Sequence, residues 1–204
     1  MPRITDQRRA TRRRQILASA WTCFSRDGFH ATSMDDIIAA TGTSASGVYR
    51  YFSSKEELIE AAGEESMAVF RALFDRLRAT EPVPDIATTI AALAEPVGSG
   101  EEYDLSRVAI QAWAEALRQP RLRERVGEFY REMRIQLAEL ARRWQQVGLL
   151  APQASPEAVG LALATLLPGM LVARHTADPV TADQVLAGLR GLAHANEAAD
   201  GPAA

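Results

Sequence analysis

Only one cysteine, one lysine and three histidines occur among the 204 residues. With Cys23 alone no intrachain disulfide can form, which fits a reducing cytoplasm, and we interpret Cys23 as a packed thiol rather than a redox sensor. No run of about 18 apolar residues suggests a membrane span. No apolar segment with a cleavage site follows the Arg-rich N-terminus, so we expect no signal peptide. These absences favour a cytoplasmic protein that has no membrane partner.

Signatures of catalysis and metal binding are also missing. None of the three histidines, His30, His175 and His194, has a metal-like partner four residues further on. No Gly-rich phosphate loop occurs, and no Cys/His or Ser/His/Asp set stands out. We therefore expect no catalytic residues, no metal and no cofactor, and we predict that the chain is not an enzyme.

The net charge of −3 looks unsuited to a nucleic-acid partner, but the charges are unevenly distributed. Residues 1–60 hold nine basic and seven acidic residues, whereas residues 61–204 hold fourteen and nineteen. Six of the basic residues lie in the first fourteen positions: Arg3, Arg8, Arg9, Arg12, Arg13 and Arg14. We expect residues 1–10 to form a disordered basic arm, which either contacts DNA or is a solvated tail.

What the sequence does contain is centred on residues 33–58, SMDDIIAATGTSASGVYRYFSSKEEL. Ser33 can cap a helix, Asp36 is placed to complete a capping box, and apolar residues follow at helical spacing. Gly42 supplies a left-handed helix end, and a second short helix with a Ser/Thr cap can begin two or three residues later. This pattern predicts a helix-turn-helix, whose second helix would enter a DNA major groove by its N-terminal residues.

We expect ten residues to contact DNA, nine within this segment and Thr32 directly before it. Small side chains lead the second helix and let its backbone approach closely, and the tyrosines behind them can reach phosphates. Arg50 is the candidate for a guanine edge, with a phosphate contact as the alternative. The N-terminus of the first helix also favours a phosphate. The predicted contacts are Thr32, Ser33, Ser44, Ala45, Ser46, Gly47, Tyr49, Arg50, Tyr51 and Lys55.

The same segment resembles the TetR (tetracycline-repressor) family of bacterial transcription regulators. The residues that carry the resemblance cover about a quarter of the chain and lie at Ile16–Ala20, Phe24–Phe29, Ala31–Ser33 and Tyr49–Leu58. Tyr51 stands where many members have histidine, which leaves the operator sequence open. The resemblance implies operator DNA as a partner, with the DNA contacts at the positions named above.

Helical periodicity continues along the rest of the chain, and no alternating strand pattern competes with it. We predict an all-α fold of about nine helices, a number that also matches what the resemblance implies. The N-terminal DNA-binding domain would span residues 1–58, with its arm at 1–10, and residues 59–204 would form an effector-binding and dimerisation domain. Beyond residue 53, helices are expected near 54–78, 85–94, 103–117, 120–147, 155–176 and 181–196, with a loop at 96–100.

Two groups of residues in the second domain are candidate sites. Apolar and aromatic residues on the core faces of three long helices either line an effector pocket or pack the core: Met67, Phe70, Phe74, Trp113, Phe129, Met133 and Trp144. The last two helices are too apolar to be solvated on their outer faces, and we expect them to form a homodimer interface. Its predicted residues are Leu161, Ala164, Leu171, Val185, Leu189 and Leu192.

The sequence thus predicts a homodimeric transcriptional repressor that a small, largely apolar effector releases from a palindromic operator. An activator, or a DNA-binding regulator without an effector, is the alternative within the same class. A helical protein-interaction bundle is the alternative from a different class. The arginines near the N-terminus and Lys55 argue against that bundle.

Overall fold

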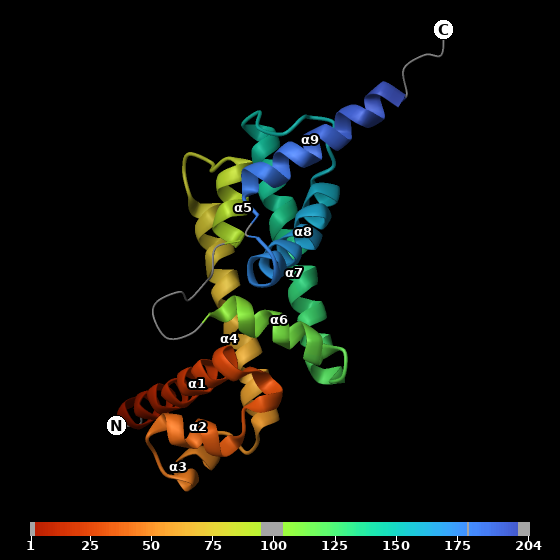
Figure 1. The fold of residues 1–204 in the computed structure, drawn as a ribbon. Coiled ribbons are helices and arrows are strands. Elements are labelled where there is room, and N and C mark those ends of the chain that lie inside the picture. The colour runs from red at the N-terminus through yellow and green to blue at the C-terminus, as the bar shows by residue number, and fades with distance from the viewer. Residues whose placement is uncertain (1–2, 95–103, 179, 200–204) are drawn as a thin grey trace. The chain divides into compact units, whose positions relative to one another are not determined.

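A computed structural model of the chain describes residues 3–94, 104–178 and 180–199 (Figure 1). Over these residues the chain forms nine α-helices and no strand, as predicted. The helices are α1 (Arg3–Ala31), α2 (Met34–Thr41), α3 (Ala45–Tyr49), α4 (Lys55–Ala79), α5 (Ile86–Ala94), α6 (Leu105–Ala116), α7 (Pro120–Gln146), α8 (Pro156–Thr176) and α9 (Ala182–Ala199). The predicted bounds of α4 to α8 agree closely, whereas the predicted loop at 96–100 lies outside the described residues.

The chain packs as two compact units. The head unit comprises Met1–Ala72 and Pro96–Phe129, and the second unit comprises Leu73–Glu95 and Tyr130–Ala204. Long helices α4 and α7 therefore contribute residues to both units. The head unit takes in α6, whose buried residues Leu105, Val108 and Ala112 belong to the same apolar core as α1. The functional division at residue 58 remains a prediction, because packing alone does not define where DNA is bound.

Helix α1 begins earlier than predicted. It starts at Arg3, so the expected disordered arm at residues 1–10 is wrong from residue 3 onward. Arg, Gln and Ala all favour helix, and no Gly or Pro interrupts residues 3–27, so the helix includes residues 3–10 although these first residues have no apolar stripe. Gly28 breaks the helix, because its φ of 87° and ψ of 164° are not helical.

Aromatic packing fixes the helix-turn-helix to α1 in the head unit. The Phe24 and Phe29 rings meet edge to face with centroids 4.9 Å apart, on either side of Gly28. Ile37 from α2 and Val48 from α3 are fully buried in the same core. Each buried side chain of this size contributes roughly 1.5–3 kcal/mol, so α2 and α3 are held by their inner faces.

The second unit holds the end of α4 against the end of α7. The Trp144 indole is fully buried and donates to the Pro84 carbonyl at 2.9 Å. Next to it, the Arg143 guanidinium donates to the carbonyls of Leu77, Arg78 and Thr80. An arginine that donates to the last carbonyls of a helix replaces the missing intrahelical hydrogen bonds, so Arg143 caps the C-terminal end of α4.

Helix α8 corrects the expectation that no stretch resembles a membrane span. Its 21 residues have a mean hydropathy of 1.6 over the best 18-residue window, so by length and composition it is apolar enough to cross a membrane. Only 33% of that window is buried within the chain. Core helices of soluble proteins are also long and apolar enough by these measures, which therefore do not by themselves place α8 in a membrane.

Candidate DNA-binding surface

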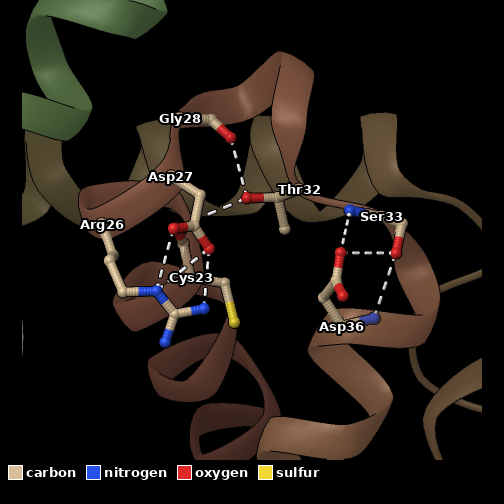
Figure 2. A network of polar contacts seen from close by, with 7 residues as sticks. All are labelled: Cys23, Arg26, Asp27, Gly28, Thr32, Ser33 and Asp36. Carbon is tan, nitrogen blue, oxygen red and sulfur yellow. Dashed lines mark hydrogen bonds and ion pairs between the residues drawn. The ribbon is translucent and has the colours of Figure 1, made fainter.

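Helix α2 begins with the predicted capping box. The Asp36 amide donates to the Ser33 hydroxyl at 3.1 Å, and the Ser33 amide donates to an Asp36 carboxylate oxygen at 2.8 Å (Figure 2). The box satisfies two of the unpaired donors at this helix end. At the other end Gly42 adopts φ 60° and ψ 21°, the left-handed geometry that the sequence predicted.

Helix α3 presents an exposed face that begins at its N-terminus. Ser44 caps the helix and accepts from the Gly47 amide at 3.2 Å. The exposed residues are Ser44, Ala45, Ser46, Tyr49 and Arg50, all of which were predicted DNA contacts. Val48 between them is fully buried and anchors the helix. The short side chains stand at the leading end, where a recognition helix approaches base edges.

A side chain at Gly47 would be tightly placed. A Cβ at this position would lie 3.2 Å from the Thr43 hydroxyl oxygen and 3.3 Å from the Ser44 hydroxyl oxygen. It would therefore press on the residue that caps the helix. Gly47 is half-buried, so it contributes backbone geometry more than contact area to the surface.

Aromatic rings hold two arginines of this region. The Arg50 guanidinium carbon lies 5.4 Å from the centroid of the half-buried Tyr51 ring, and that of Arg13 lies 4.7 Å from the buried Phe52 ring. Such stacking holds the planar guanidinium group against the ring. The arginine side chain therefore loses less rotamer freedom when it binds DNA. Tyr49 is 47% exposed, and Tyr51 provides a platform for Arg50; the contacts of both tyrosines with DNA stay predictions.

Thr32 is not a DNA contact, which corrects the prediction. The residue is only 1% exposed, and its hydroxyl donates to the Gly28 carbonyl at 2.8 Å (Figure 2). The Thr32 amide donates to the same carbonyl at 3.2 Å. Its polar groups are therefore used inside the turn between α1 and α2, and neither is directed to a phosphate.

Ser33 is exposed but its donors are engaged. Its hydroxyl lies 2.6 Å from the Asp36 carboxylate, which also accepts from the Ser33 amide. These hydrogen bonds, first from the Ser33 hydroxyl and then from its amide, lower the pKa of Asp36. The Asp36 carboxylate thus occupies the N-terminus of α2 and competes with a phosphate there, and the contact of Ser33 with DNA stays a prediction.

Lys55 lies where it was expected, at the start of α4, but its ammonium already has protein partners. It donates to the carbonyl oxygens of Phe29 at 2.9 Å and Thr32 at 3.0 Å. An ammonium group has three donors, so one remains for a phosphate. Lys55 also joins α4 to the turn before α2, a role that the sequence did not reveal because the partners lie more than twenty residues away.

The predicted effector residues do not gather in one unit. Met67, Phe70, Trp113 and Phe129 belong to the head unit, and Phe74, Met133 and Trp144 to the second unit. Phe70 and Phe129 are neighbours, with ring centroids 5.9 Å apart. Trp144 is fully buried and its N–H is hydrogen-bonded, so of the two predicted roles, pocket lining and core packing, we assign it to the core.

A charged groove runs between α4 and α7 within the head unit. It encloses about 560 Å³, and Met67 is the only predicted effector residue in its lining. Seven other residues line it, all of them charged: Glu60, Glu64, Arg71, Arg121, Glu124, Arg125 and Glu128. Arg125 forms ion pairs with Glu60, at 4.0 Å, and with Glu64. This groove differs from the apolar pocket that the sequence predicted.

The predicted interface residues divide by exposure. Leu161 and Leu189 are exposed by 50% and 43%, and Val185 is half-buried. Ala164 and Leu171 face the core of their own unit, which corrects their assignment to an outer face. Leu192 lies outside the residues whose side chains are described. A period of 3.6 places residues on every side of α8, and composition alone could not separate the inner from the outer side.

The segment thus has a capped short helix, a glycine turn and a second helix that is exposed at its leading end. These features define a helix-turn-helix regulator that binds DNA. Residues 16–62 match bacterial regulatory proteins of the tetR family, and residues 97–196 match the C-terminal part of BetI-type transcriptional repressors. The chain belongs to the TetR family of transcriptional regulators.

Individual relatives support this assignment. An uncharacterised HTH-type transcriptional regulator, YfiR of Bacillus subtilis, is 41% identical over 51 residues, a match that spans 25% of this chain and 25% of that protein. The structure of Salmonella enterica GusR is 25% identical, with a TM-score of 0.63 over 81% of this chain and 88% of that one. A regulator from Saccharomonospora viridis, solved in complex with choline, shares the fold at 22% identity, with a TM-score of 0.70 over 89% and 95% of the chains.

Proposed function

We propose that the protein is a homodimeric repressor that binds a palindromic operator and is released from it by a small molecule. The observation that carries the proposal is the exposed face of α3, where short side chains lead and Tyr49 and Arg50 follow. Ser44 and Ser46 would meet base edges or phosphates, Tyr49 a phosphate, and Arg50 the O6 and N7 of a guanine. Operator DNA is therefore the primary partner.

The outer surface of α8 supports a homodimer. Its exposed small and apolar residues recur at steps of three and four along one side of the helix: Ala158, Leu161, Ala162, Thr165, Gly169 and Val172. A Cβ at Gly169 would meet no atom of the chain within 4 Å, so a partner helix could approach closely there. Leu189 extends an apolar surface onto α9. A two-fold axis through such a surface would also pair two α3 helices on a palindrome.

Two comparisons favour a repressor with an effector. The C-terminal match is to repressors of the BetI type, and one structural relative was solved with choline bound. The effector of this chain could be the largely apolar compound that the sequence suggested, bound near the Phe70 and Phe129 rings. The charged groove that Met67 lines favours a cation instead, because its four carboxylates outnumber its three guanidinium groups.

The alternatives lead to different results. An activator would bind the same operator but raise transcription, and an effector-independent regulator would not respond to any compound. A protein-interaction bundle would show no preference among DNA sequences. An enzyme would require a catalytic set, for which the sequence offers no motif.

Footprinting of the purified protein on the DNA upstream of its own gene tests the proposal. We expect protection of one palindromic segment, and binding there tighter than to a scrambled duplex of equal length. Arg50→Met should cost about 1–3 kcal/mol and relax the preference at one base pair per half-site. Arg107→Met, an exposed arginine on α6 outside the motif, is the matched control. Equal losses in both variants, or equal binding to scrambled DNA, would refute sequence reading by α3.

Thermal melts test the effector. Choline chloride and indole serve as a cationic and an apolar probe, with sodium chloride at the same ionic strength as control. A ligand at about 100 times its dissociation constant stabilises the protein by roughly 2.7 kcal/mol. A probe that raises the melting temperature and also lowers operator binding identifies the effector class. Stabilisation without release from DNA would contradict an inducer role.

A further inference from the structure

A side chain from α6 bridges the break in α1 at Gly28. The Phe29 amide donates to the Gln111 side-chain oxygen at 2.7 Å, and the Gln111 side-chain nitrogen donates to the Phe24 carbonyl at 3.0 Å. One carboxamide thus bonds the backbone on both sides of the non-helical Gly28. We refer to Gln111 and these two hydrogen bonds as the Gln111 bridge. Phe24 and Phe29 are buried, so these backbone groups have few alternative partners.

The bridge needs a close approach of Gln111 to the turn. A Cβ placed on Gly28 would lie 3.4 Å from the Gln111 side-chain oxygen, and the φ of 87° is itself unfavourable for any other residue. Glutamine suits the position because it combines one donor and one acceptor in a single planar group. Glutamate would lose the donor, and methionine would lose both while keeping the length.

Glu115 near the end of α6 and Arg118 just after it reach the same segment of α1. Glu115 and Arg118 follow Gln111 at steps of four and seven, and they lie 3.5 Å and 3.1 Å from the His30 ring nitrogen. His30 is 75% exposed, so these contacts contribute little free energy. The half-buried Gln111 bridge thus supplies two hydrogen bonds from α6 to the end of α1, beside the one that the Asp104 amide donates to the Ser25 hydroxyl at 3.2 Å.

What the bridge holds in place is the start of α2. The Gly28 carbonyl accepts hydrogen bonds from both the amide and the hydroxyl of Thr32. The Lys55 ammonium donates hydrogen bonds to the carbonyls of Phe29 and Thr32. Residues 28–32 thereby form a turn with few free polar groups, which leads directly to the capping box at Ser33. A shift of Phe29 would move the beginning of α2, and with it α3.

We propose that Gln111 is a positioning residue for operator binding, although it lies on α6, outside the helix-turn-helix, and contacts no DNA. The inference rests on the proposed operator binding. Through the Gln111 bridge, α6 keeps the turn at residues 28–32 in the geometry that presents α3 to the major groove. Without the bridge the binding-competent geometry is populated less, and the apparent dissociation constant rises by the inverse of that population.

Hydrogen exchange without DNA tests the bridge itself. In the wild-type protein the Phe29 amide should be protected although it follows the break in the helix. Gln111→Met should accelerate its exchange about tenfold or more, because a buried donor loses its acceptor. Gln111→Glu keeps an acceptor, so the Phe29 amide should stay protected. Gln119→Met is the matched control, since the side-chain nitrogen of Gln119 donates to the Glu115 carboxylate and not to α1.

Binding measurements then test the positioning role. Operator affinity of Gln111→Met should fall about tenfold, while affinity for random DNA, which depends on charge, should change less than about twofold. The proposal would be overturned if the Phe29 amide exchanged freely in the wild-type protein, or if operator affinity were unchanged in Gln111→Met. It would also be overturned if Gln111→Met lost as much affinity for random DNA as for the operator. Failure of both Gln111 variants to fold would also overturn it, by making the residue purely structural. A wild type that binds no operator would instead refute the proposed function, whatever the exchange data show.

Discussion

The contact between α7 and α8 predicts a large effect of one methyl group. Gly160 faces α7 so closely that a Cβ would lie 2.8 Å from both the Ala138 amide nitrogen and the Arg134 carbonyl oxygen. It would also lie 3.2 Å from the Ala138 Cα. All three are backbone atoms, so no flexible side chain can move aside. Gly160→Ala must therefore separate the two helices or distort one of them.

The magnitude follows from two opposing terms. Overpacking a well-packed site costs about 1–3 kcal/mol. Replacing a helical glycine by alanine returns roughly 0.5–1 kcal/mol through backbone entropy. We expect a net loss of about 1–2 kcal/mol, which lowers the melting temperature by about 2–8 °C for a chain of this size.

Gly63 provides a matched control for this experiment. It is also a buried helical glycine, but a Cβ there would meet only Leu122 Cδ1, at an ordinary 3.7 Å. Gly63→Ala should leave stability unchanged or raise it by up to about 1 kcal/mol. Melts followed by circular dichroism at one protein concentration compare the two variants. If Gly160→Ala melts at or above the wild-type temperature, the close packing of α7 and α8 is wrong.

Three further predictions concern DNA, the dimer and the thiol. Lys55→Ala should weaken binding to random DNA and lower the salt slope by about 0.9, since one of its donors remains for a phosphate, and it should weaken operator binding more, because the bonds to the turn before α2 are lost as well; an unchanged slope would leave Lys55 only its bonds to the turn. Leu189→Arg should yield a helical monomer that no longer binds the operator, as light scattering and circular dichroism can show, and a mutant that stays dimeric would contradict the interface. Burial raises the pKa of the Cys23 thiol, so it should react with a thiol reagent far more slowly in the folded protein than in denaturant, and equal rates would contradict its burial.

The sequence predicted best the features that depend on neighbouring residues. The capping box of Ser33 and Asp36, the left-handed Gly42 and the cap at Ser44 are all completed within three or four residues. The exposed face of α3 followed from the same local pattern. Such local capping interactions can be read most directly from a single sequence.

Features that depend on distant partners were missed or misassigned. Thr32 looked like an exposed cap residue, but its hydroxyl turns back to Gly28. Gln111 belongs to no motif, because its partners lie 82 and 87 residues away along the chain. On α8, Ala164 and Leu161 have the same apolar character and differ only in which side the rest of the unit covers. Tertiary packing makes these distinctions, and a periodic pattern does not contain them.

The buried Cys23 has a practical consequence for measuring how the protein responds to its ligands. Because this is the sole thiol of the chain and it is shielded, a cysteine introduced at an exposed position would be the only site that takes a spin label quickly. Ala40, exposed on α2, is such a position and lies outside the face of α3. In a homodimer each molecule would then carry two labels, and the distance between them would follow the two DNA-binding heads. Pulsed electron paramagnetic resonance could record that distance with and without choline in an otherwise native chain.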